Sequence, residues 1–120
     1  MKDSVINIYQ IFTRLFANAN ETNKEFGSIR ENGCSKFSNV TSLALSEIKK
    51  MGVTHVWYTG VIRHASCTSY AKNGLSADNP QVVKGQAGSP YAIKDCYDVD
   101  PDLATNVKSR MKEFEAMLDR

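Results

Sequence analysis

The sequence predicts an α/β fold in which parallel strands alternate with helices. Two short segments, 5–12 and 53–58, are dense in β-branched and aromatic residues, which is typical of strands buried on both faces. Helical patterns occupy residues 41–51, between these segments, and residues 105–120, at the end. A strand, a helix and a second strand in this order predict a βαβ unit, whose strands are parallel.

Length and composition restrict the function classes. The chain has 120 residues, of which 42% are hydrophobic and 23% charged, with a net charge of +2, as expected for one globular domain. The cationic residues are interleaved with acidic ones, so no nucleic-acid partner is expected. The longest apolar stretch, 53–62, is too short for a membrane partner. Polar residues interrupt the first 16 positions, which favours a cytoplasmic location, or a periplasmic or secreted one if a signal peptide has been removed.

The first helix is predicted over residues 41–51, after a long polar loop at 13–39. Leu45, Ile48 and Met51 fall near one helical face. Asn39 or Thr41 can cap the beginning of this helix, and Gly52 can take the left-handed conformation after its end.

Residues 59–103 show neither helical periodicity nor strong strand alternation, and we expect one long loop with at most a short strand near 97–99. The second helix, 105–120, has an apolar face and Thr105 as its expected N-cap. This face is formed by Val107, Met111, Phe114 and Leu118.

Two parallel strands leave unpaired edges, and a loop of this length is unusual inside a small domain. We therefore expect the opening of a longer β/α protein: a βαβ unit at 1–58, a long loop at 59–103 and a second helix at 104–120. Exposed strand edges also predict that the chain can self-associate.

Three segments in register carry a family resemblance. VINIYQIFTRLF at 5–16, IKKMGVTHVW at 48–57 and GSPYAIKDCYDVDPDLA at 88–104 resemble the N-terminal part of the α-amylase family of glycoside hydrolases. The resemblance implies the first two strands and helices of a TIM (β/α)8 barrel, with residues 59–103 as a loop at the active-site face.

The resemblance also implies an activity: retaining cleavage of α-glucosidic bonds in starch-like glucans or malto-oligosaccharides, as part of carbohydrate metabolism. The Asp nucleophile and Glu acid/base of the family lie on later strands, so this chain alone is expected to be inactive. The alternative is a non-catalytic α/β module that binds carbohydrate or another protein.

Three substrate-binding residues are expected. Tyr91 matches the family tyrosine that stacks on a sugar, and Asp95 matches a loop aspartate that orients its neighbours. His64 follows the second strand, at the mouth where sugar hydroxyls would bind. The sequence departs from the family at Pro90, where a glycine is common, and at Gly88, where many relatives carry an acid.

No metal or other cofactor is expected to be required. A zinc site formed by His64, Cys67 and Cys96 is disfavoured because tetrahedral sites normally show two close ligand pairs. The loop after the first strand contains several asparagines but only Glu21 as an acid in 18–23, which gives little charge for calcium, although the full-length protein could bind it. The alternating acids Asp98, Asp100 and Asp102 lack the EF-hand pattern and are expected to set a turn and favour the second helix.

Overall fold

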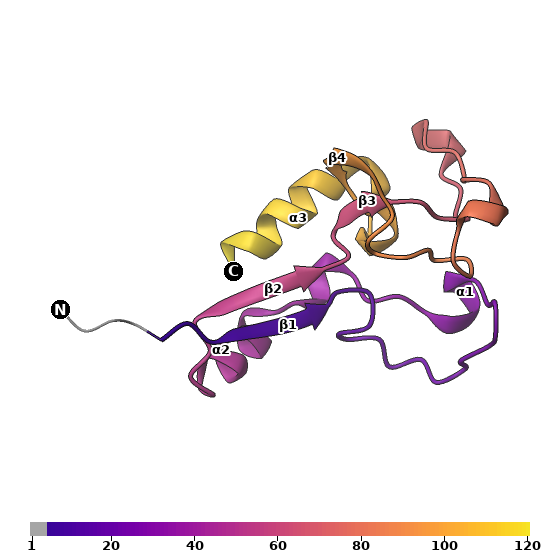
Figure 1. The fold of residues 1–120 in the computed structure, drawn as a ribbon. Coiled ribbons are helices and arrows are strands. Elements are labelled where there is room, and N and C mark those ends of the chain that lie inside the picture. Colours follow the sequence, from indigo (N-terminus) through magenta and orange to yellow (C-terminus); the bar gives the residue numbers. More distant parts are fainter. Residues whose placement is uncertain (1–4) are drawn as a thin grey trace.

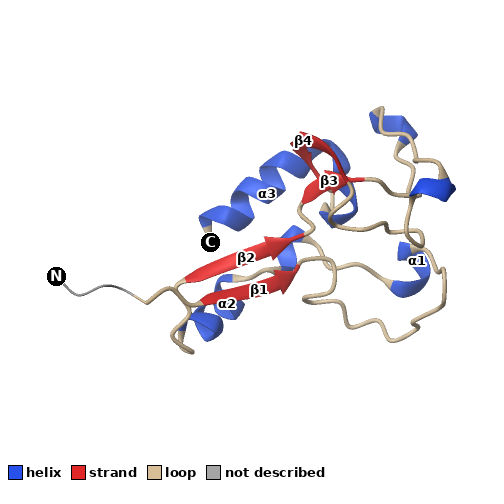
Figure 2. Ribbon diagram, in the orientation of Figure 1, coloured by secondary structure: helices blue, strands red, loops and turns tan. Residues whose placement is uncertain are grey.

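Four strands and three α-helices, joined by short 3-10 turns, make up the part of the chain that the computed structural model describes, residues 5–120 (Figures 1 and 2). Residues 1–4 of the predicted βαβ unit lie outside this range. In chain order the elements are β1 (Ile8–Phe12), α1 (Ile29–Asn32), α2 (Ser42–Lys49), β2 (His55–Thr59), β3 (Ile62–His64), β4 (Ile93–Val99) and α3 (Arg110–Asp119).

The predicted parallel strand pair is confirmed. β1 and β2 pair in parallel over five positions, from Ile8 opposite His55 to Phe12 opposite Thr59. Asn7 fixes the start of the pair: its main-chain N–H donates to Thr54 Oγ1 at 2.9 Å, and its side-chain amide donates to Gly52 O at 3.0 Å. The loops that follow both strands extend beyond their carboxyl ends (Figure 1).

The helix between these strands also forms where the pattern predicts it. Thr41 is the N-cap of α2, and its Oγ1 accepts a hydrogen bond from Ala44 N at 3.2 Å. Gly52 has a φ of 84°, the left-handed conformation that allows the chain to leave a helix and enter β2. Local capping chemistry is therefore sufficient to predict this element.

The expectation that these strands are buried on both faces is wrong. Ile8 in β1 is 62% exposed and Trp57 in β2 is 51% exposed. One face of the pair therefore lacks a covering layer within residues 5–120, although the composition of both strands is that of buried ones.

The predicted portion of a TIM barrel is likewise wrong. Residues 59–103 contain β3 and β4, which pair antiparallel in a second two-stranded sheet separate from β1 and β2. A TIM barrel has one closed sheet of parallel strands, so this arrangement is a small α/β fold with two sheets and not evidently a part of a barrel. Register irregularities next to Arg63 and the exposure of much of β4 explain why the sequence shows no clean strand alternation.

The second predicted helix begins later than expected. A 3-10 turn occupies Val107–Ser109 and α3 follows, so the prediction of Thr105 as N-cap is wrong. The carboxylate of Glu113 instead accepts hydrogen bonds from the main-chain N–H groups of Thr105 and Asn106, at 2.8 and 2.9 Å. Glu113 thus satisfies two main-chain donors ahead of the helix. The capping bond itself comes from Asn106, whose Oδ1 accepts a hydrogen bond from Lys108 N at 3.1 Å.

Ion pairs join α3 to the second sheet. Arg110 binds Asp98 with two hydrogen bonds, Nε to Oδ1 at 2.7 Å and an NH2 group to Oδ2 at 3.0 Å. Arg63 on β3 approaches the same carboxylate at 3.5 Å. Asp98 therefore anchors the first residue of α3 to β4, while the expected electrostatic effect of the three acids on this helix stays a prediction.

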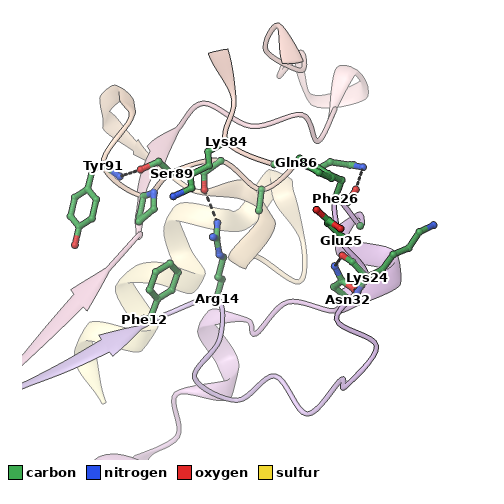
Figure 3. Close-up of a pocket in the computed structure, with 15 residues that line it drawn as sticks. Phe12, Arg14, Lys24, Glu25, Phe26, Asn32, Lys84, Gln86, Ser89 and Tyr91 are labelled. Atoms are coloured by element: carbon green, nitrogen blue, oxygen red, sulfur yellow. Dashed lines mark hydrogen bonds between the residues drawn. The ribbon is translucent and has the colours of Figure 1, made fainter. Parts of the chain in front are cut away.

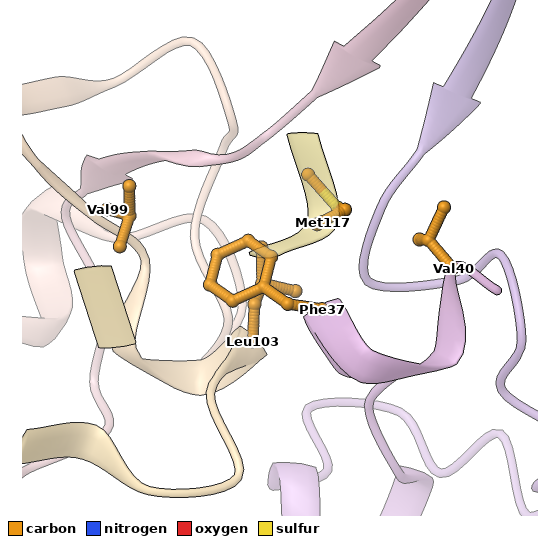
Figure 4. Packing of buried hydrophobic residues seen from close by; sticks show 5 residues of the cluster. All are labelled: Phe37, Val40, Val99, Leu103 and Met117. Carbon is orange, nitrogen blue, oxygen red and sulfur yellow. The ribbon is translucent and has the colours of Figure 1, made fainter. Parts of the chain in front are cut away.

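The core lies where α3 meets the 3-10 turn Phe37–Asn39 and the end of β4 (Figure 4). Phe37 is completely buried and its ring lies 5.8 Å from that of Phe114 on α3, centroid to centroid. The cluster of buried residues consists of Phe37, Val40, Val99, Leu103 and Met117. Residues that are far apart in sequence therefore hold the two sheets and α3 together, while the loops are left to form the site.

Candidate functional site

Three chain segments meet around a concave surface beyond the carboxyl ends of β1 and β2, which we call the Tyr91 hollow (Figure 3). Its lining comes from Phe12 and Arg14 after β1, from residues 24–27 with Asn32, and from residues 84–91. Its volume is about 620 Å³. Ligands of α/β proteins commonly bind beyond the carboxyl ends of parallel strands, and small-molecule sites have volumes of this size.

Tyr91 stands on the rim of this hollow. Its side chain is 70% exposed, whereas its main-chain N–H is fixed by a 3.3 Å hydrogen bond to Ser89 Oγ. The same residue also lines a smaller hollow of about 160 Å³ that includes Trp57 and Ile93. The structure therefore places Tyr91 as an exposed aromatic surface on a locally fixed main chain, which is suitable for stacking on a ligand.

Arg14 forms part of the floor of the hollow. One NH1 group donates to Gly88 O at 2.9 Å, and the guanidinium lies over the Phe12 ring, 4.9 Å from its centroid. Arg14 also lines an adjoining hollow of about 340 Å³. The sequence interpretation did not select Arg14, because a single arginine after a strand carries no distinctive spacing.

The backbone near Tyr91 depends on a glycine. Gly88 has a φ of 82°, and a Cβ at this position would lie 1.9 Å from the main-chain oxygen of Ala65. No side chain fits there without movement of the loop. The close approach of residues 65 and 88 thus explains why this chain has a glycine where the resemblance expects an acid.

His64 lies beneath this loop and is only 4% exposed. Its Nε2 lies 3.1 Å from Ala87 O, and its Nδ1 lies 3.2 Å from Ile62 O. The ring therefore supports the loop that carries Tyr91 and offers almost no surface to a ligand.

Asp95 occupies the middle of β4, and its Oδ1 accepts a hydrogen bond from Tyr97 N at 2.9 Å. It is not among the residues that line the Tyr91 hollow. The structure does not bring Tyr91, His64 and Asp95 together into one set of ligand contacts; of the three, Tyr91 alone lines the hollow.

A pair of buried acids lies below the site. Asp100 is 4% exposed and Asp102 is 3% exposed. Asp102 accepts hydrogen bonds from Tyr70 OH at 2.6 Å and from Thr68 Oγ1 at 3.3 Å, and its main-chain N–H donates to Asp100 Oδ1 at 3.0 Å. This confirms the expectation that these acids set a turn.

Burial and the neighbouring charge of Asp102 together raise the pKa of Asp100 to about 6, while His64 acts in the opposite direction. Two neighbouring carboxyl groups, one with a raised pKa, are a combination that glycosidases also use. A hollow that Asp102 shares with Tyr70 and Thr68 has a volume of only about 10 Å³, which is too small for a sugar ring. Asp102 also borders the hollow of about 340 Å³ that Arg14 lines, but at 3% exposure it offers a ligand almost no surface there. We therefore assign these acids to the support of the loop.

Among residues 5–120, no group of three or more His, Cys, Asp or Glu side chains is arranged to hold a metal ion. No helix in the described part of the chain has both the length and the apolar character needed to cross a membrane. Comparison with models of known protein families, with curated proteins and with solved structures gives no match for this chain.

Proposed function

We propose that this chain is an α-glucan-binding part of a retaining glycoside hydrolase of the α-amylase type, and that sugar units bind in the Tyr91 hollow. Two kinds of support meet here. The resemblance of residues 88–104 assigns Tyr91 to sugar stacking, and the geometry gives Tyr91 an exposed ring beside a concave surface. The proposal concerns binding and does not depend on a barrel.

The observation that carries the proposal is the position of Tyr91 on the rim of the hollow. A pyranose ring has an apolar face of C–H groups, which stacks favourably on an aromatic ring. The main-chain hydrogen bond from Tyr91 to Ser89 limits the orientations of the residue before binding. Binding therefore orders less of the protein than it would on a free loop.

The role of this chain in the reaction is to bind substrate. The resemblance assigns the catalytic acids to other strands, and the two buried acids, Asp100 and Asp102, are inaccessible to a sugar. We expect residues 1–120 alone to bind malto-oligosaccharides without cleaving them. A reducing-sugar assay with purified chain and soluble starch tests the second expectation, and release of sugar above the rate of a heat-denatured sample would contradict it.

Isothermal titration calorimetry with maltoheptaose tests the binding site. Replacing Tyr91 with alanine should weaken binding by about tenfold, since it removes both the stacking and its buried area. Tyr97→Ala is the matched control, because Tyr97 is 94% exposed on β4 and does not line the hollow. Equal affinities of wild type and Tyr91→Ala, or an equal loss in both variants, would overturn the site assignment.

A second candidate function, an interaction module, is favoured by the uncovered face of the parallel sheet. Ile8 on β1 and Trp57 on β2 are exposed, and both outer edges of this pair are unpaired within the described residues. Self-association should appear as a mass above that of the monomer in size-exclusion chromatography with light scattering. Ile8→Lys should reduce it, whereas Val82→Lys, at an exposed loop position, should not.

A further inference from the structure

The Tyr91 hollow has cations in its lining that a neutral sugar does not require. Arg14, Lys24 and Lys84 line it, together with the single carboxylate of Glu25. Lys24 forms an ion pair with Glu31, which leaves Arg14 and Lys84 without a carboxylate partner in residues 5–120. The lining therefore carries more positive than negative charge.

Arg14 is oriented before any ligand arrives. Its hydrogen bond to Gly88 O uses one NH1 donor, and the Phe12 ring lies against the guanidinium. The Nε and NH2 groups donate no hydrogen bond to a residue in the described part of the chain. A half-buried guanidinium with unused donors is suited to bind two oxygens of a phosphate or a carboxylate group.

The cations and the aromatic side chain belong to the same surface. Figure 3 shows Arg14 between Tyr91 at one end of the hollow and the segment that contains Lys24, Glu25 and Phe26 at the other. The Tyr91 ring points outward from the rim, so it is a further unit of the same oligosaccharide, bound inside the hollow, that would present a substituent to Arg14. Lys84 is exposed and lines the same hollow, and its long side chain has a charged end that can approach the same substituent.

We propose that the glucan bound in the Tyr91 hollow carries an oxyanion, a phosphate ester or a carboxylate, which Arg14 binds directly and Lys84 attracts. This inference rests on the proposed function, because it takes a sugar on Tyr91 as given. It adds a substrate class, anionic α-glucans, and assigns to Arg14 the preference for these over neutral glucans.

Calorimetric titration with four probes tests the inference: maltoheptaose, maltoheptaose phosphorylated on one O6, the same oligosaccharide with one terminal glucuronate, and inorganic phosphate. The wild-type chain should bind at least one of the anionic oligosaccharides about tenfold more tightly than the neutral one. This advantage should decrease with added salt, because the charges are partly exposed. The phosphate and glucuronate arms identify which oxyanion is preferred.

Variants assign the effect to residues. Arg14→Gln should reduce the ratio of anionic to neutral oligosaccharide affinity to about one, whatever its effect on maltoheptaose binding itself, whereas Arg14→Lys should restore only part of this ratio because lysine lacks the planar fork. Lys84→Gln should reduce the advantage without a risk to folding, since Lys84 is exposed. Lys112→Gln, on the exposed surface of α3, is the charge-matched control and should have no effect.

Each contrary outcome has a distinct meaning. Equal affinity of the neutral and both anionic oligosaccharides, with the Tyr91→Ala loss intact, overturns the oxyanion inference and leaves the proposed function in place. Binding of inorganic phosphate as tightly as the phosphorylated oligosaccharide shows an ion site and overturns the inference as well. Loss of the Tyr91→Ala effect on every oligosaccharide overturns the proposed function itself.

Discussion

Nε2 of His64 lies 3.9 Å from Oδ2 of Asp100, with both side chains almost completely buried below the loop that carries Tyr91. The same ring nitrogen faces Ala87 O, one residue before the glycine that contacts Arg14. The buried acids and the floor of the Tyr91 hollow are therefore connected through His64. We therefore expect the stability of this loop to depend on the ionisation of Asp100.

We predict that Asp100 makes folding less favourable as the pH rises from about 4 to about 6. Its pKa is raised in the fold, so the folded state binds more protons than the unfolded state in this window, and its contribution is lost as the carboxyl ionises. Asp100→Asn keeps an oxygen acceptor for Asp102 N but cannot ionise. The free energy of unfolding of Asp100→Asn, relative to wild type, should increase by on the order of 1–3 kcal/mol between pH 4 and pH 7.5.

Urea denaturation at several pH values measures this difference. Taking the variant relative to wild type cancels the contributions of Asp78, Asp98 and Glu31, whose pKa values are lowered by hydrogen bonds and cations and whose pH dependence has the opposite sign. A difference that does not change with pH would contradict the prediction.

Tyr70→Phe should destabilise the fold by about 1.5–3 kcal/mol, because it removes a hydrogen-bond donor from the buried carboxylate of Asp102. Burial and the hydrogen bond to Asp102 raise the pKa of Tyr70, so the hydroxyl keeps its proton and remains a donor. Thermal denaturation of the variant measures the loss. Tyr97→Phe, at an exposed ring, should stay within about 0.5 kcal/mol of wild type, and an equal effect at both positions would contradict this account.

Gly88→Ala should cost about 3 kcal/mol or more, since the new Cβ adds a collision with Ala65 O to an unfavourable φ. Gly85→Ala is the matched control: its φ is 63°, but nothing lies within 4 Å of the added Cβ. The control should lose only about 1–2 kcal/mol. Denaturant unfolding of both variants, together with maltoheptaose titration, tests whether position 88 alone affects both stability and binding.

The three cysteines should react with a thiol reagent in the order of their exposure. Cys96 is exposed and should react first, whereas burial raises the pKa of Cys34 to about 11 and leaves little thiolate at pH 8. Mass spectrometry of peptides after timed labelling gives the order. Labelling in guanidinium should make all three rates similar; if Cys34 still reacts slowest there, its protection does not come from the fold.

The elements that the sequence predicts correctly are those whose stabilising interactions join residues close together along the chain. The pairing of β1 with β2 and the position of α2 are predictable, because hydrophobic patterns, the Thr41 cap and the turn at Gly52 are local signals. The β3–β4 pair is not predictable from a pattern, because its register is irregular and much of β4 is exposed. The prediction of a barrel is wrong because this second, antiparallel pair lies where a loop was expected.

The candidate site shows the same division. The resemblance selects Tyr91, and the structure places it on the rim of a hollow, but nothing in the sequence indicates that His64 lies beneath that loop or that Arg14 reaches Gly88. These contacts connect residues that are more than twenty positions apart, and they exist only once the chain has folded.

By itself, then, the sequence determined the local elements and the kind of surface residues available to a ligand. The tertiary structure alone decided which of them meet. Phe37 and Val40 pack with Val99, Leu103 and Met117 in one core, although the two groups are separated by about half the chain. That packing brings the loops after β1 and β2 together, because burial of apolar surface is non-directional and acts between any segments that can approach.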